Sequence, residues 1–94
     1  MNRADRITHK LNQALAPARL SVIDESHRHA GHAGAQPGGE THYQVAVVAA
    51  AFEGMTRVQR QRRVYELLAD EFKTGLHALA LTTATPAEAD RITL

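Results

Sequence analysis

Residues 52–81 read FEGMTRVQRQRRVYELLADEFKTGLHALAL, and the organisation of the whole chain follows from them. The triplet Phe52-Glu53-Gly54 predicts a tight turn, because glycine tolerates the positive φ that many turns require. The next residues predict a basic helix over 57–73 that stops at Gly75. A strand then opens on His77. Strand, helix and strand in succession indicate a crossover that places two parallel strands in one sheet.

The helix is supported by its cap and by its periodicity. Thr56 is a good N-cap, and Gln59, three residues later, completes a capping box in which each side chain accepts from an orphan backbone N–H. Lys73 suits the negative end of the helix dipole. The residues expected on the buried arc of a 3.6-residue wheel are Val58, Val64, Tyr65, Leu68, Ala69 and Phe72.

Four arginines crowd the first two turns of this helix, namely Arg57, Arg60, Arg62 and Arg63. Cations near a helix N-terminus oppose the dipole, so local helix stability does not explain them. One interpretation is an ordinary solvated charged face. The other is a docking surface for an acidic partner.

Composition bounds the class of protein. With 94 residues, of which 44% are hydrophobic and 22% charged, the chain is expected to fold as one domain. A formal net charge of +1 is far from the strongly basic balance of a dedicated nucleic-acid-binding domain. The absence of cysteine excludes disulfides and thiolate ligands. No apolar run suggests a signal peptide or a membrane span, so we expect a cytoplasmic protein without a membrane partner.

The remaining segments complete an α-β-β-α-β-α order. Apolar residues at helical spacing predict a first helix over 2–15, which Pro17 ends. Short runs with β-branched residues predict strands over 20–26, 42–49 and 76–82. Thr85 and Pro86 begin a short last helix, with Glu88 as the capping-box partner. We therefore expect one α+β domain over 1–94, with its core over about 6–88 and helices on one face of a three-stranded mixed sheet.

Histidine is the residue type that suggests a site. Residues 27–41 form a connection much longer than the usual ~4–6 residues, and they hold His27, His29 and His32 among glycines that predict mobility. His77 stands at the start of a rigid strand. A rigid imidazole with a mobile one would make an adjustable, incomplete site for iron, zinc, copper or nickel. The alternative is a polar loop exposed to solvent.

The other two histidines have simpler interpretations. His42, at a strand start, is expected to hydrogen-bond a neighbouring backbone group and do nothing more. His9 lies on the exposed side of the first helix. No Ser-His-Asp arrangement, P-loop, GxGxxG or HExxH motif occurs, so we expect a binding module or adaptor without enzymatic activity or a small-molecule substrate.

These residues together resemble the BolA family. The matching segments lie in family order and at family spacing over roughly residues 6–88. They are Asp24-Glu25-Ser26 before a histidine loop, Glu40-Thr41-His42-Tyr43, Phe52-Glu53-Gly54, Arg60-x-Arg62-x-Val64-Tyr65-x-x-Leu68, His77-Ala78-Leu79-Ala80-Leu81 and Thr85-Pro86. No single match is specific, whereas the ordered set is.

The resemblance implies a fold similar to the class II KH domain and a partnership with monothiol glutaredoxins. In such a pair a [2Fe-2S] cluster is shared, the glutaredoxin supplying a cysteine and glutathione and the BolA-like protein supplying histidine or cysteine. The family ligand that opens the last strand matches His77. The second ligand comes from the loop, where His29 is the first candidate and His32 the alternative. No cofactor is expected in the isolated protein.

One departure and one competing function follow from the same resemblance. The family pattern in the helix is Arg-His-Arg, and Gln61 stands here in place of the histidine. BolA-like proteins are also described as transcriptional regulators, so the alternative function is DNA binding through the basic helix 57–73. Against it, the GXXG loop with which KH domains clamp the nucleic-acid backbone is absent, and few aromatic residues are present for base stacking.

Overall fold

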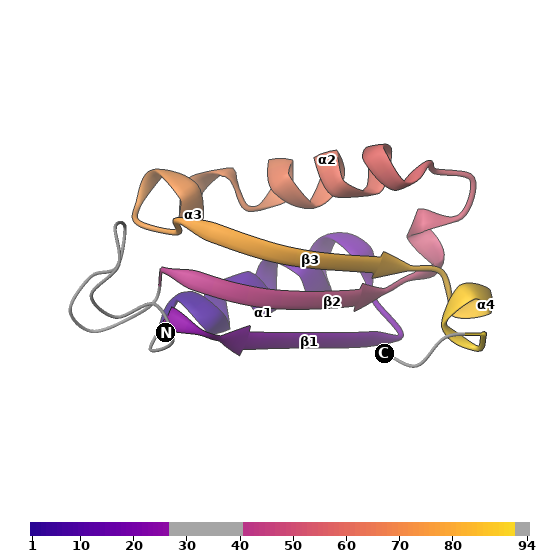
Figure 1. The fold of residues 1–94 in the computed structure, drawn as a ribbon, viewed down its shortest axis with the longest axis horizontal. Coiled ribbons are helices and arrows are strands. Elements are labelled where there is room, and N and C mark those ends of the chain that lie inside the picture. The colour runs from indigo at the N-terminus through magenta and orange to yellow at the C-terminus, as the bar shows by residue number, and fades with distance from the viewer. Residues whose placement is uncertain (27–40, 92–94) are drawn as a thin grey trace.

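The computed structural model describes residues 1–26 and 41–91. Three strands form one sheet in the spatial order β1 (Arg19–Asp24), β2 (His42–Val48) and β3 (Ala78–Ala84) (Figure 1). β1 pairs antiparallel with β2, and β3 pairs parallel with β2. The sheet is therefore mixed, as the sequence predicted.

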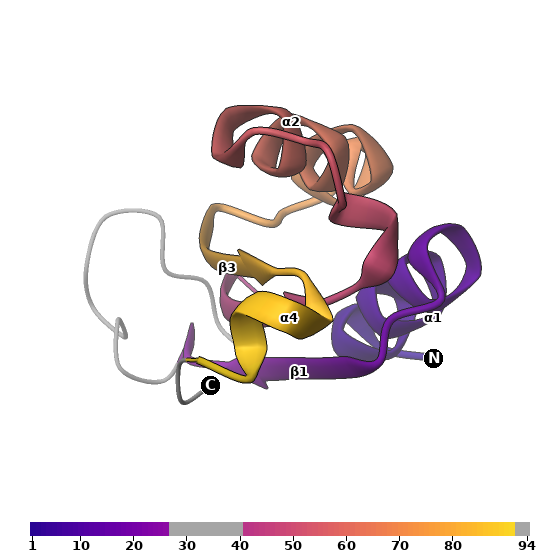
Figure 2. The same cartoon turned by 90° about the vertical axis from the view of Figure 1, so that its right-hand side faces the viewer.

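Helices α1 (Arg3–Leu15), α2 (Arg57–Leu67) and α3 (Ala69–Lys73) lie on the same side of this sheet (Figures 1 and 2). A 3₁₀ turn, η2 (Ala50–Phe52), precedes α2, and the short helix α4 (Pro86–Ala89) follows β3. The α+β architecture expected from the sequence is confirmed. The core lies between the two layers, with Ile7 and Leu11 of α1 packing with Val45 and Val47 of β2, all of them fully buried.

Local signals place the helix starts. Asn2 and Asp5 form a capping box at α1, Thr56 and Gln59 form one at α2, and the Thr85 and Glu88 pair forms a third at α4. The predicted first helix over 2–15 is thus confirmed, with Asn2 as its cap. Gly54 has φ of +79°, which is the positive backbone angle expected of this turn residue.

The predicted basic helix over 57–73 is two helices, because the chain breaks at Leu68, where φ is −102° and ψ is 11°. The predicted buried arc is also wrong in part. Val64 and Leu68 are fully buried, but Val58 is 57% exposed and Tyr65 40% exposed. The reason is that α2 lies alongside β3, an edge strand (Figure 1), so only a narrow strip of its surface, which includes Val64, is buried in the core.

The third strand begins later than predicted. It runs over 78–84, whereas the apolar pattern suggested 76–82. Leu76 is apolar because it belongs to the core, where it is 3% exposed, and it lies in the connection between α3 and β3. His77 is therefore the residue immediately before β3.

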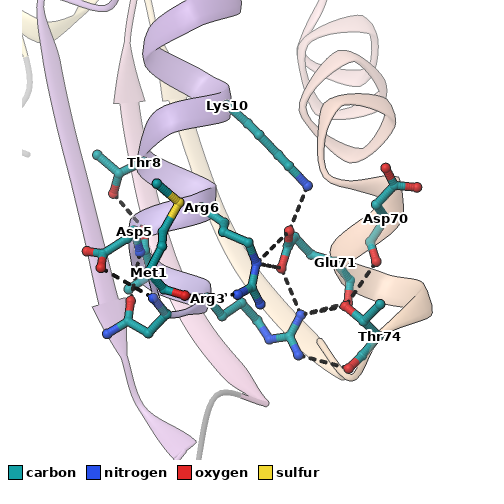
Figure 3. Close-up of polar contacts among 11 residues, drawn as sticks. Met1, Arg3, Asp5, Arg6, Thr8, Lys10, Asp70, Glu71 and Thr74 are labelled. Atoms are coloured by element: carbon teal, nitrogen blue, oxygen red, sulfur yellow. Dashed lines mark hydrogen bonds and ion pairs between the residues drawn. The ribbon is translucent and has the colours of Figure 1, made fainter.

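A buried carboxylate joins α1 to α3 (Figure 3). Glu71 is 2% exposed, and its carboxylate oxygens lie 2.8 Å from Arg3 Nη1, 3.1 Å from Arg6 Nε and 2.6 Å from Lys10 Nζ. Arg3 also donates to the backbone oxygens of Glu71 and Thr74. Burial by itself would raise the pKa of Glu71, but the hydrogen bonds and charges of Lys10 and Arg6 outweigh it and lower that pKa below its ordinary 4.5.

Candidate functional site

His77 is an exposed imidazole on a fixed backbone. The backbone N–H of His77 donates to the carbonyl oxygen of Thr41 at 2.7 Å, and the backbone N–H of Ala78 donates to the same oxygen at 3.1 Å. Its ring lies beside that of His42, with ring centroids 5.7 Å apart and an angle of 50° between the planes. A second imidazole therefore stands next to the residue that the sequence singled out as a ligand.

His42 is mostly buried, 8% exposed, at the first residue of β2. Its Nδ1 lies 2.8 Å from the Thr41 hydroxyl, a side-chain contact that the sequence did not predict. A hydrogen bond on one ring nitrogen fixes the orientation of an imidazole. Nothing in the sequence predicts that this ring would lie beside that of His77, because the two positions are 35 residues apart.

Ser26 and Thr41, the described residues on either side of residues 27–40, lie close together, and Thr41 contacts His77. The Ser26 hydroxyl oxygen accepts from the N–H of Thr41 at 2.8 Å and from that of His42 at 3.0 Å. His27, His29 and His32, and with them the predicted loop ligand, lie outside the described residues. Among the residues that the structure describes, no three His, Asp or Glu side chains gather in a way that could hold a metal ion.

The four helix arginines divide into two groups. Arg57, Arg62 and Arg63 are exposed, whereas Arg60 points toward α4, where its Nη1 lies 2.5 Å from Glu88 Oε1. Arg60 Nε also donates to the Met55 carbonyl at 3.0 Å, and its guanidinium lies over the Phe52 ring. Arg60 thus ties α2 to α4.

Glu88 has a second role that its capping-box position did not reveal. The hydrogen bond from Arg60, followed by that from the Thr85 backbone, lowers the pKa of Glu88 to about 2. Around this pair lies a hollow of about 550 Å³, lined by Met55, Arg57, Arg60, Thr82, Thr83, Ala84, Glu88 and Arg91. The N-terminal end of α2 therefore presents cations beside the end of β3.

The residue that departs from the family pattern, Gln61, is half-buried on α2. None of the helices that the structure describes is long and apolar enough to cross a membrane.

Comparison with known proteins identifies one family. A protein family described as BolA-like protein matches residues 11–88. The chain is 48% identical over 89 residues to Protein BOLA1, chloroplastic, of Arabidopsis thaliana, covering 93% of this chain but only 56% of that protein. It is 47% identical over 95 residues to an uncharacterized protein in the cobS 5′ region of a Sinorhizobium species, covering 97% of this chain and 99% of that one.

Solved structures agree. BolA1 from Arabidopsis thaliana superposes with a TM-score of 0.84 at 48% identity, covering 94% of this chain and 96% of that chain. The solution structure of BolA1 from Mus musculus superposes with a TM-score of 0.78 at 44% identity, covering 95% of this chain and 69% of that chain. The likeness thus extends over nearly the whole sequence and the whole fold.

Proposed function

Since this chain belongs to the BolA family, we propose that it is an adaptor that pairs with a monothiol glutaredoxin and shares a [2Fe-2S] cluster with it. The adaptor would serve iron–sulfur cluster trafficking or iron sensing. The observation that carries the proposal is the position of His77. It is an exposed imidazole whose backbone is hydrogen-bonded to Thr41, and Thr41 and Ser26 are the described residues on either side of residues 27–40.

The donor set of the chain fits a shared cluster. It holds no cysteine, so its own contribution to iron must be imidazole or carboxylate, and imidazole is a good iron ligand. A partner that supplies thiolates would complete the set. Histidine ligation raises the reduction potential of a cluster relative to thiolate ligation, which suits a cluster that is transferred or sensed.

Histidines would bind the cluster and arginines would bind the partner protein. His77 would bind iron together with His29, or with His32 as the alternative loop ligand. The exposed cations Arg57, Arg62 and Arg63 of α2 would face an acidic surface of the partner, as charge complementarity favours association. Arg60 would support this surface through Glu88.

Anaerobic titration of a cluster-loaded monothiol glutaredoxin with the apo-protein tests the proposal. Visible absorption and circular dichroism are followed for wild type, His77→Ala, His29→Ala, His32→Ala and, as a control, His9→Ala, whose imidazole is exposed on α1. We expect the wild type and His9→Ala to change the spectrum and His77→Ala to leave it unchanged. A wild type that leaves the glutaredoxin spectrum as it was would refute the shared cluster.

The second candidate function is binding of duplex DNA. The observation that favours it is the set of three exposed cations on α2, Arg57, Arg62 and Arg63, although the net charge of +1 provides little general attraction. If each contacts a phosphate, the slope of log K against log salt should approach about −0.9 per contact. Arg62→Ser should reduce that slope by about 1, whereas binding without salt dependence would exclude this function.

A further inference from the structure

The peptide group between Thr41 and His42 is held from both sides. Its N–H, on His42, donates to the Ser26 hydroxyl oxygen at 3.0 Å. Its carbonyl oxygen, on Thr41, accepts from the N–H groups of His77 and Ala78 at 2.7 and 3.1 Å. Because the N–H and C=O of one peptide group point in opposite directions and belong to one rigid plane, a change at one end tilts the other.

Ser26 is built to hold that plane. Its side chain is buried, with the residue 6% exposed, and its hydroxyl oxygen also accepts from the Thr41 N–H at 2.8 Å. Its own N–H donates to Asp24 Oδ1 at 2.8 Å, which fixes the turn at the end of β1. One hydroxyl thus satisfies two neighbouring backbone donors in a place from which water is largely excluded.

The same residues orient the second imidazole. The Thr41 hydroxyl contacts His42 Nδ1 at 2.8 Å, and Thr41 is 1% exposed. A line of hydrogen bonds therefore runs from the end of β1, through one peptide group, to the backbone of His77. Hydrogen bonds that are joined in such a chain strengthen one another in a low-dielectric interior.

We propose that Ser26 is a positioning residue for His77, acting through the Thr41–His42 peptide group. The inference rests on the proposed function of His77 as a cluster ligand, and it adds a residue that does not itself touch the cluster. A metal ligand must be held to within about 0.5 Å by the groups behind it. The Ser26 hydroxyl is such a group, because it restrains the carbonyl that holds the His77 N–H.

Ser26→Ala removes the acceptor and leaves the rest of the turn in place. In the isolated protein we expect the amides of Thr41, His42 and His77 to exchange hydrogen about tenfold faster, the change that corresponds to about one lost hydrogen bond. Amides in the middle of α1 should keep their wild-type rates. With cluster-loaded glutaredoxin, the variant should give an altered visible circular dichroism spectrum and a shifted reduction potential.

Three further variants make the test specific. Ser21→Ala makes the same change at an exposed position of β1 and should match wild type in every measurement. Ser26→Thr keeps the hydroxyl and should restore both the exchange rates and the potential. If Ser26→Ala does not fold, Asp24→Ala, which removes the acceptor of the Ser26 N–H, should give the same changes to a smaller extent.

The outcomes are separable. If Ser26→Ala speeds exchange at Thr41 and His42 but leaves the His77 amide and the cluster potential as in wild type, Ser26 only closes the turn and the inference is overturned. If wild type and His77→Ala behave alike with glutaredoxin, the proposed function fails. In that case the exchange rate of the His77 amide still decides whether Ser26 holds its backbone.

Discussion

Glu71 shows how one residue can hold two elements together. A carboxylate that is 2% exposed would be costly by itself, and here three cations from α1 surround it. Two of those cations, Arg6 and Lys10, keep about a third of their side-chain surface in water, so their loss of hydration is partial. The cluster is therefore expected to stabilise the contact between α1 and α3.

Replacing this carboxylate by an amide should be strongly destabilising. Glu71→Gln leaves three cations facing a neutral group, and we expect the free energy of unfolding to fall by roughly 3 kcal/mol, the order found when one partner of a buried ion pair is removed. Urea unfolding followed by far-UV circular dichroism measures it. Asp70→Asn, at the neighbouring position where the carboxylate is 81% exposed, is the matched control and should change stability very little. Equal effects of the two variants would mean that the Glu71 cluster contributes nothing.

Helix α2 has a buried strip and an exposed strip that the sequence does not distinguish. Val64 is fully buried against the core, whereas Val58, six residues earlier in the same helix, is 57% exposed. The two valines lose the same atoms on truncation to alanine and gain the same helix propensity. The difference between the two variants in the free energy of unfolding therefore measures how well each valine is packed.

We expect Val64→Ala to lower the free energy of unfolding by about 2 kcal/mol, from the lost burial of two methyl groups and the cavity left behind. Val58→Ala should stay within about 0.5 kcal/mol of wild type. Chemical denaturation of both variants at one temperature provides the comparison. A loss at Val58 as large as at Val64 would show that α2 packs by a different face.

What could be predicted from the sequence at this level was local. The predicted capping boxes begun by Thr56 and Thr85 involve residues three apart, and both are present, as is a third box, begun by Asn2, that was not predicted. The break at Leu68 and the burial of Glu71 were not predicted, since the Glu71 cluster depends on Arg3, 68 residues away. His77 could be singled out from the sequence as a candidate ligand, but its nearness to His42 and its support by Thr41 arise only from the pairing of β2 with β3. All three predicted ligands, His77, His29 and His32, remain predictions.

The molecule as a whole should lose stability in acid. Glu71 and Glu88 both have pKa values in the folded state below 4.5, that of Glu88 about 2. The unfolded state therefore binds protons first as the pH falls, and stability present above about pH 4.5 is lost progressively toward pH 2. Thermal unfolding between pH 2 and 7 measures this loss. Glu88→Gln should lower the unfolding temperature near neutral pH and make that temperature less dependent on pH below 4.5. If the unfolding temperature of the variant falls as steeply with pH as that of wild type, other carboxylates cause the loss.

The measurement that bears on the whole proposal is pulsed electron paramagnetic resonance of the reduced cluster in the mixed complex. The chain is labelled with ¹⁵N-histidine, and the monothiol glutaredoxin is left unlabelled. We expect hyperfine couplings from ¹⁵N of this chain for wild type and their partial or complete loss for His77→Ala, because His77 would bind iron directly. A reduced cluster that shows no ¹⁵N coupling in the wild-type complex would mean that no histidine of this chain is a ligand, and the shared-cluster proposal would fall.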